Sequence, residues 1–174
     1  LFSALLAGLL LITRQWRQAI FAISTLLFTA LANTATKLFF ARLRPEVLSD
    51  PLSSYSMPSG HASGSFALFL TLAVLAGRGQ PPRMRLTWLL VASLPAMAIA
   101  LSRVYLGAHW PTDVMAGTML AACVCATSLY LVQRREPLKA LPPKAWWLIL
   151  TAMIALFAFF ILRHLPHTML RYAY

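Results

Sequence analysis

Basic side chains and histidines of this chain gather in three groups, each at the end of a long apolar segment. The groups are Lys37 with Arg44, then Pro58-Ser59-Gly60-His61, and finally Arg103 with His109 and Asp113. Charged groups beside such segments are costly and are usually functional. Two imidazoles, three cations and one carboxylate are the side chains needed to hold a phosphoryl group and transfer it through a histidine. We therefore interpret the three groups as parts of one phosphate-binding site.

The first group can hold an anion by charge. Lys37 and Arg44 are seven residues apart, about two helical turns, so they share one face if the helix continues that far. Arginine would contribute a planar fork and lysine a point charge. The alternative is that both side chains only extend to lipid headgroups. Arg42 lies on another face, and we expect it only to reach the headgroups.

The second group stands at the start of a predicted helix. Ser59 is suited to be its N-cap, and the free N–H groups and the dipole of a helix N-terminus favour an anion. Gly60 would let a phosphate approach the backbone, and His61 would stand beside it as a proton donor. The alternative is an ordinary helix cap with an incidental histidine.

The third group can supply a nucleophile. Asp113 follows His109 by four residues, so its carboxylate can reach back to the imidazole. A carboxylate that accepts from one ring nitrogen fixes the tautomer and leaves the other nitrogen free to attack. Arg103, at the end of the preceding apolar segment, can point into the same space. The alternative is a His–Asp pair that only caps the helix.

The composition is that of a membrane protein. Hydrophobic residues make up 60% of the chain and charged residues 11%, with a mean hydropathy of +0.72, whereas soluble domains carry about 25% charged residues. The net charge of +11 could indicate nucleic acid in a soluble protein. Here the cations lie in short loops and helix ends, which favours anionic lipids and topology signals, and no nucleic-acid partner is expected. Cys123 and Cys125 give no metal-binding spacing, so no metal or other cofactor is predicted.

Apolar segments define the predicted fold, an all-α transmembrane helical bundle of about six segments. They run over residues 1–12, 18–41, 60–77, 86–105, 111–132 and 145–162. The last five are close to the ~20 residues that a spanning helix needs, and the first is expected to be truncated by residues missing upstream. We expect a single membrane domain over residues 1–174, with a core at 14–133 and an extra C-terminal helix at about 145–162.

Cations in the short loops predict the orientation. If the helices alternate, nine of them fall on one side: Arg14, Arg17, Arg78, Arg83, Arg85, Arg134, Arg135, Lys139 and Lys144. That side should be cytoplasmic. The loop at 45–58 and all three site groups fall on the other side. The expected location is therefore a multi-pass cell membrane, with a bacterial inner membrane favoured and the site facing the periplasm or exterior.

In order and spacing, the three groups closely resemble the signature of the type 2 phosphatidic acid phosphatase family. That signature is Lys, six residues, Arg-Pro; then Pro-Ser-Gly-His; then Ser-Arg, five residues, His, three residues, Asp. This chain reads Lys37…Arg44-Pro45, Pro58-Ser59-Gly60-His61 and Ser102-Arg103…His109…Asp113. The resemblance covers roughly residues 14–133. Membrane members usually carry the first motif at the end of their third helix, whereas here it ends the second apolar segment. Related soluble haloperoxidases are disfavoured by the spanning segments.

The resemblance implies a metal-independent mechanism with a role for each residue. His109 attacks phosphorus to form a phosphohistidine, Asp113 orients His109, and His61 protonates the leaving oxygen. The phosphoryl oxygens are held by Lys37, Arg44, Arg103, Ser59 and Gly60. Water then hydrolyses the intermediate.

We therefore expect a membrane lipid phosphatase that hydrolyses a phosphate monoester or pyrophosphate. Candidate substrates are undecaprenyl pyrophosphate, phosphatidic acid, phosphatidylglycerophosphate and lipid A phosphate. Two alternatives stay open. One is a lipid phosphotransferase that uses the same intermediate, and the other is a non-catalytic module that binds or translocates lipid.

Overall fold

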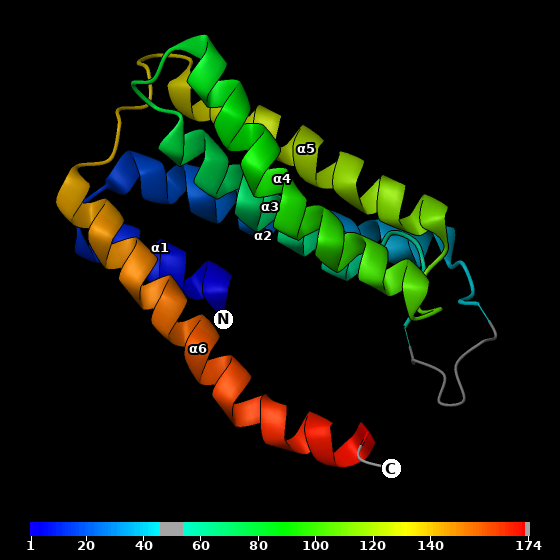
Figure 1. The fold of residues 1–174 in the computed structure, drawn as a ribbon. Coiled ribbons are helices and arrows are strands. Elements are labelled where there is room, and N and C mark those ends of the chain that lie inside the picture. Colours follow the sequence, from blue (N-terminus) through cyan, green and yellow to red (C-terminus); the bar gives the residue numbers. More distant parts are fainter. Residues whose placement is uncertain (46–53, 173–174) are drawn as a thin grey trace.

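The computed structural model describes residues 1–45 and 54–172 and contains six α-helices over these ranges (Figure 1). They are α1 (Phe2–Ile12), α2 (Trp16–Phe40), α3 (Gly60–Ala76), α4 (Pro82–Tyr105), α5 (Pro111–Gln133) and α6 (Pro143–Tyr172). No strand occurs in the described ranges, and the prediction of an all-α bundle is confirmed. Residues 46–53 of the predicted 45–58 loop lie outside the described residues.

Helix α3 is the centre of the bundle and packs against α2, α4 and α5 (Figure 1). Its buried side is built from Ala62, Ser63, Phe66 and Ala67, and the small residues let neighbouring backbones approach closely. With 17 residues it is shorter than the four helices that are long and apolar enough to cross a membrane. Those four are α2, α4, α5 and the Pro143–Arg163 part of α6. Their large apolar side chains are widely exposed, as expected for a multi-pass membrane protein.

Helices α1 and α6 form a second layer. Helix α1 packs against α2 and α6, and α6 then diverges from the bundle toward its C-terminus (Figure 1). Leu6, Leu10 and Ile149 join the two helices to a core that includes Phe21. The predicted end of α6 near residue 162 was too early, because the helix continues to Tyr172. Hydropathy could not find that end, since the apolar part stops at Arg163 while the backbone hydrogen bonds continue.

The two ends of the bundle differ in chemistry, as predicted. The C-termini of α2 and α4 and the N-termini of α3 and α5 lie at one end (Figure 1). These four termini carry the three predicted site groups. The nine loop cations lie at the other end, where Arg78 Nη1 donates to Gln133 Oε1 at 2.9 Å and Gln18 Nε2 donates to the Lys139 carbonyl at 3.1 Å. The alternation of helices thus separates site groups from loop cations.

Candidate active site

The end of α2 brings the first site group into place by an unexpected route. The helix stops at Phe40, and Ala41 adopts a left-handed conformation with φ 43°. The helix does not continue to Arg44, so the condition for a shared helix face of Lys37 and Arg44 is not met. Both side chains nevertheless reach the same segment, because Lys37 Nζ donates to the Tyr55 carbonyl and Arg44 Nε donates to the Ser54 carbonyl at 2.8 Å. The sharp turn at Ala41, rather than a continuous helix, thus brings Lys37 and Arg44 to the same segment.

The start of α3 is held against α5. Ser59 is the N-cap, as predicted, and its Oγ accepts from the Ala62 N–H at 3.4 Å. The Ser59 N–H donates to the Asp113 carbonyl at 2.9 Å. Gly117, one turn further along α5, leaves the space for this contact, since a Cβ there would lie 2.7 Å from the Ser59 carbonyl oxygen. Gly60 and His61, which follow the cap, are thereby fixed beside the first turn of α5.

His109 is placed by the turn between α4 and α5. The N–H groups of Ala108 and His109 donate to the Arg103 carbonyl at 3.0 and 3.2 Å. Gly107, with φ 66°, supplies the left-handed residue that this turn requires. The His109 side chain is buried, with 4% of the residue exposed. The backbone of His109 is thus held by the C-terminal end of α4.

The two ring nitrogens of His109 face different partners. Arg44 Nη1 lies 3.2 Å from Nε2 and also donates to the Ala108 carbonyl at 2.7 Å. A guanidinium can only donate, so the contact assigns the lone pair to Nε2 and the proton to Nδ1. Nδ1 lies 3.6 Å from Asp113 Oδ2, which is an electrostatic contact longer than a hydrogen bond. The predicted hydrogen bond from the ring to the carboxylate is therefore not formed, since buried Nδ1 has no hydrogen-bond partner among the described residues, and the nitrogen predicted to be free faces Arg44.

Burial and nearby cations keep His109 neutral. Burial lowers the pKa of the imidazole most, and the charges of Arg44 and Lys37 lower it further, to about 4. The Asp113 carboxylate and the Ser56 backbone act in the opposite direction but are weaker. The basic nitrogen is therefore unprotonated at neutral pH, which a nucleophile requires.

Asp113 is fully buried and accepts hydrogen bonds on both carboxylate oxygens. Oδ1 accepts from Arg42 Nη1 at 2.9 Å, and Oδ2 accepts from the Trp110 N–H at 2.9 Å and from Ser56 Oγ. The prediction that Arg42 only reaches headgroups was wrong. The turn at Ala41 directs it inward, where its guanidinium also lies 5.4 Å from the centre of the Trp110 ring. These hydrogen bonds fix the position of the Asp113 carboxylate independently of its contact with His109.

Sequence reasoning missed Arg42 and Ser56. No spacing rule links Ser56 to a carboxylate far along the chain. For Arg42, a signal would have been the end of α2 before the Arg-Pro pair, because the residue before a proline disfavours helix. Both residues hold Asp113 in place and lie beside the sequence motifs.

Arg103 and His61 complete the set of predicted residues. Arg103 Nε is buried and has no hydrogen-bond partner among the described residues. His61 is exposed, and the charges of Arg103, Arg44 and Lys37 all act on it. The described structure therefore brings the predicted cations, histidines and carboxylate to one end of the bundle. No group of three or more His, Cys, Asp or Glu side chains suited to a metal occurs in the described part of the chain.

Fold and site together define a polytopic helical membrane protein with a cluster of cations and histidines at the ends of four helices. Residues 18–137 match the PAP2 superfamily. Because this match covers more than half of the chain, the protein belongs to that superfamily.

Three curated proteins are similar in sequence to parts of this chain. The undecaprenyl-diphosphatase of Sulfolobus acidocaldarius is 31% identical over 144 residues, covering 76% of this chain and 64% of that protein. Phosphatidylglycerophosphatase B of Bacillus subtilis is 33% identical over 95 residues (52% of this chain, 46% of that protein). Lipid A 1-phosphatase of Rhizobium johnstonii is 29% identical over 133 residues (70% and 51%). The chain spans less than two thirds of the length of each relative.

A solved structure has the same fold. The crystal structure of a transmembrane PAP2-type phosphatidylglycerolphosphate phosphatase from Bacillus subtilis superposes with a TM-score of 0.65. It is 23% identical in sequence, and the match covers 78% of this chain and 68% of that one. The expected helical membrane architecture is thereby confirmed.

Proposed function

We propose that this protein is a membrane lipid phosphatase that works through a phosphohistidine on His109. The observation that carries the proposal is the placement of the His109 ring, with Nε2 3.2 Å from Arg44 Nη1 and Nδ1 facing the buried Asp113 carboxylate. Phosphatase names of the three relatives support the same reaction class. We further propose that one domain, with its core at residues 14–133, carries the site.

The proposed reaction has two displacements. The His109 Nε2 lone pair attacks phosphorus, the bond from phosphorus to the leaving oxygen breaks, and His61 donates a proton to that oxygen. Asp113 stabilises the positive charge that develops on the ring. Water then attacks the phosphohistidine, gives up a proton to His61, and releases phosphate with neutral His109. Atoms and charge balance over the cycle.

Cations and backbone donors supply the electrostatic part of the proposed catalysis. Lys37, Arg44 and Arg103 would hold the phosphoryl oxygens, together with the backbone near Ser59 and Gly60. Each charge-assisted hydrogen bond contributes about 1.5–3 kcal/mol. Three of them offset much of the cost of dehydrating a phosphate at the interface, and the helix N-terminus adds to them. We therefore propose that turnover needs no metal.

The substrate class follows from where the site lies. Helix ends at one end of an apolar bundle suit an amphiphile whose phosphate stays at the interface while its chains stay in the bilayer. We propose a lipid phosphate monoester or pyrophosphate as substrate. We also propose a bacterial inner membrane with the site facing outward, supported by the nine loop cations at the other end.

Orientation can be tested with single cysteines in a background lacking Cys123 and Cys125. A cysteine at the exposed position Tyr105 should react with an impermeant thiol reagent added to intact cells. A cysteine at Gln80, at the other end, should react only after lysis. The reverse pattern would place the site on the cytoplasmic side.

The reaction class can be tested with purified protein and a panel of lipid phosphates. We expect release of inorganic phosphate that survives EDTA and is lost in His109→Ala. Phosphorylated acceptor lipid instead of free phosphate would indicate a transferase. Lipid movement that is unaffected by His109→Ala, without any phosphate release, would indicate a non-catalytic module.

A further inference from the structure

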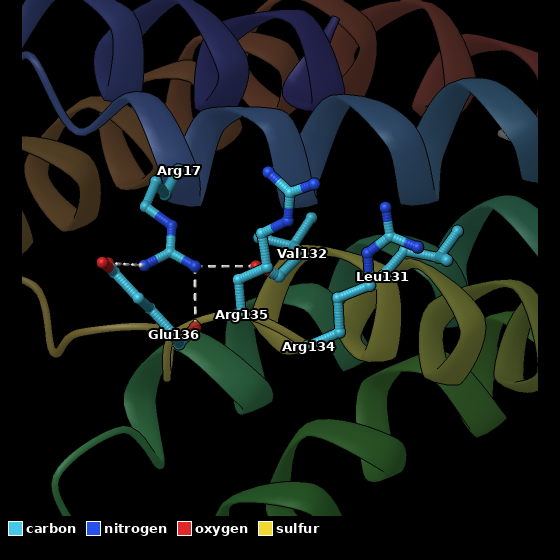
Figure 2. A pocket seen from close by; sticks show the side chains of 6 residues that line it. All are labelled: Arg17, Leu131, Val132, Arg134, Arg135 and Glu136. Atoms are coloured by element: carbon cyan, nitrogen blue, oxygen red, sulfur yellow. Dashed lines mark hydrogen bonds and ion pairs between the residues drawn. The ribbon is translucent and has the colours of Figure 1, made fainter.

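A second cluster of arginines lies at the end of the bundle opposite the site. Figure 2 shows side chains that line a pocket formed by the start of α2, the end of α5 and the residues that follow it. The pocket has a volume of about 430 Å³. Its lining contains Arg17, Leu131, Val132, Arg134, Arg135 and Glu136. Three cations against one carboxylate leave this pocket positive. The lining suits an anion, and nothing in the proposed reaction uses it.

Arg17 is already engaged, whereas its two neighbours are available. Arg17 forms an ion pair with Glu136 at 3.0 Å and donates to the carbonyls of Val132 and Glu136, each at 2.7 Å. Arg134 and Arg135 have no hydrogen bond or ion pair to any described residue. In Figure 2 their guanidinium groups point the same way, away from the Glu136 carboxylate. Arg17 thus neutralises Glu136, and the guanidinium groups of Arg134 and Arg135 remain available beside the pocket.

An apolar groove continues from this pocket into the membrane region. It has a volume of about 690 Å³, lies between α2 and α5, and shares Arg17, Leu131 and Val132 with the pocket. Ile20, Phe28 and Leu131 line it and are more than half exposed, at 57%, 56% and 52%. The groove is therefore open toward the bilayer, with its cationic end at the loops.

Groove length matches one leaflet of a bilayer. From Arg17 to Phe28 the lining follows α2 for eleven residues, about 16 Å at the rise of an α-helix. Half of a ~30 Å hydrocarbon core is ~15 Å. A chain whose headgroup lies at the arginines would reach the middle of the membrane at the far end of the groove.

We propose that this pocket and groove bind an anionic glycerophospholipid, with its phosphate at Arg134 and Arg135 and one acyl chain between α2 and α5. Basic pockets between transmembrane helices are suited to anionic headgroups. The continuous apolar groove selects a lipid over free phosphate, since free phosphate would leave the groove unused. The proposal concerns binding alone and does not depend on catalysis by His109.

Native mass spectrometry of the full chain in mild detergent tests the proposal, with phosphatidylglycerol, phosphatidylcholine and inorganic phosphate as probes. We expect retention of phosphatidylglycerol over phosphatidylcholine. Arg134→Gln/Arg135→Gln should weaken it by at least about tenfold, since both arginines are removed and the loss of even one charge-assisted hydrogen bond predicts that change. Thr127→Trp, which fills the groove, should weaken it as well. The matched control is Arg83→Gln/Lys144→Gln, which removes two exposed cations from the same end.

Three results would overturn the proposal. They are equal retention of both lipids, an equal loss of phosphatidylglycerol in the control, or phosphate binding that depends on the two arginines while Thr127→Trp changes nothing. Because His109→Ala leaves the pocket intact, it should retain phosphatidylglycerol as the wild type does. The lipid site and the proposed reaction can therefore fail independently.

Discussion

Gly117→Ala tests whether close packing of α5 on α3 positions the site. The new Cβ would lie 2.7 Å from the Ser59 carbonyl oxygen, 3.2 Å from the Ser63 nitrogen and 3.3 Å from the Ala62 Cβ. The first two atoms form the first backbone hydrogen bond of α3. They are main-chain atoms and cannot rotate away as a flexible side chain could. The two helices must therefore move apart at Ser59.

The size of the effect follows from the distance. Ordinary van der Waals contact begins at 3.4 Å, so the Ser59 carbonyl must give way by about 0.7 Å. Overpacking of this kind costs about 1–3 kcal/mol of stability. A displacement near 1 Å in a catalytic group can lower the rate by about 100-fold. We expect the rate to fall by roughly 10- to 100-fold while the protein still folds, because Gly60 and His61 follow Ser59 directly.

The assay is kcat/KM for phosphate release, measured beside thermal unfolding in the same detergent. Gly64→Ala is the matched control, because a Cβ at Gly64 meets nothing within 4 Å and alanine favours a helix over glycine by about 1 kcal/mol. It should retain activity and be no less stable. Wild-type activity and stability in Gly117→Ala would refute the positioning role of this contact.

Three further predictions concern the charges of the site. Arg42→Ala should lower kcat with little change in KM and destabilise the protein by roughly 1–3 kcal/mol, because buried Asp113 loses its cation. Arg42→Lys should recover part of kcat. A change in KM alone would contradict the positioning role of Arg42. The acid limb of kcat/KM should lie near pH 4, because burial and the charges of Arg44 and Lys37 lower the pKa of His109 to about 4. Activity needs the neutral ring and is lost as pH falls through that value. An acid limb near pH 6.5 would contradict the lowered pKa of His109. The pKa of His109, followed by NMR, should rise in Arg44→Gln. His61→Ala should slow a lipid monoester more than a pyrophosphate, because an alkoxide leaving group needs a proton more, and equal losses would remove His61 as the acid.

The helices could be predicted from the sequence because each depends on local signals. Apolar segments of spanning length and Ser59 as a cap can be recognised from the residues of each segment alone. The separation of loop cations from site groups then followed from alternation alone. The late end of α6 was missed, because it lies beyond the apolar segment.

The contacts around Asp113 could not be predicted, because they depend on turns rather than on periodicity. The left-handed Ala41 ends α2 and directs Arg42 inward. Ser56 reaches the same carboxylate from a connecting segment. Gly117 had no sequence signal either, since its role depends on how closely α5 approaches Ser59. The roles of Arg42, Ser56 and Gly117 all depend on tertiary packing, which no local pattern of residues predicts.

A structure of the protein with bound vanadate tests the central claim most directly. Vanadate adopts the five-coordinate geometry of phosphoryl transfer. We predict a bond from vanadium to His109 Nε2, oxygens held by Lys37, Arg44 and Arg103, and His61 beside the oxygen opposite His109. Vanadate bound elsewhere, or bound equally well in His109→Ala, would contradict the account.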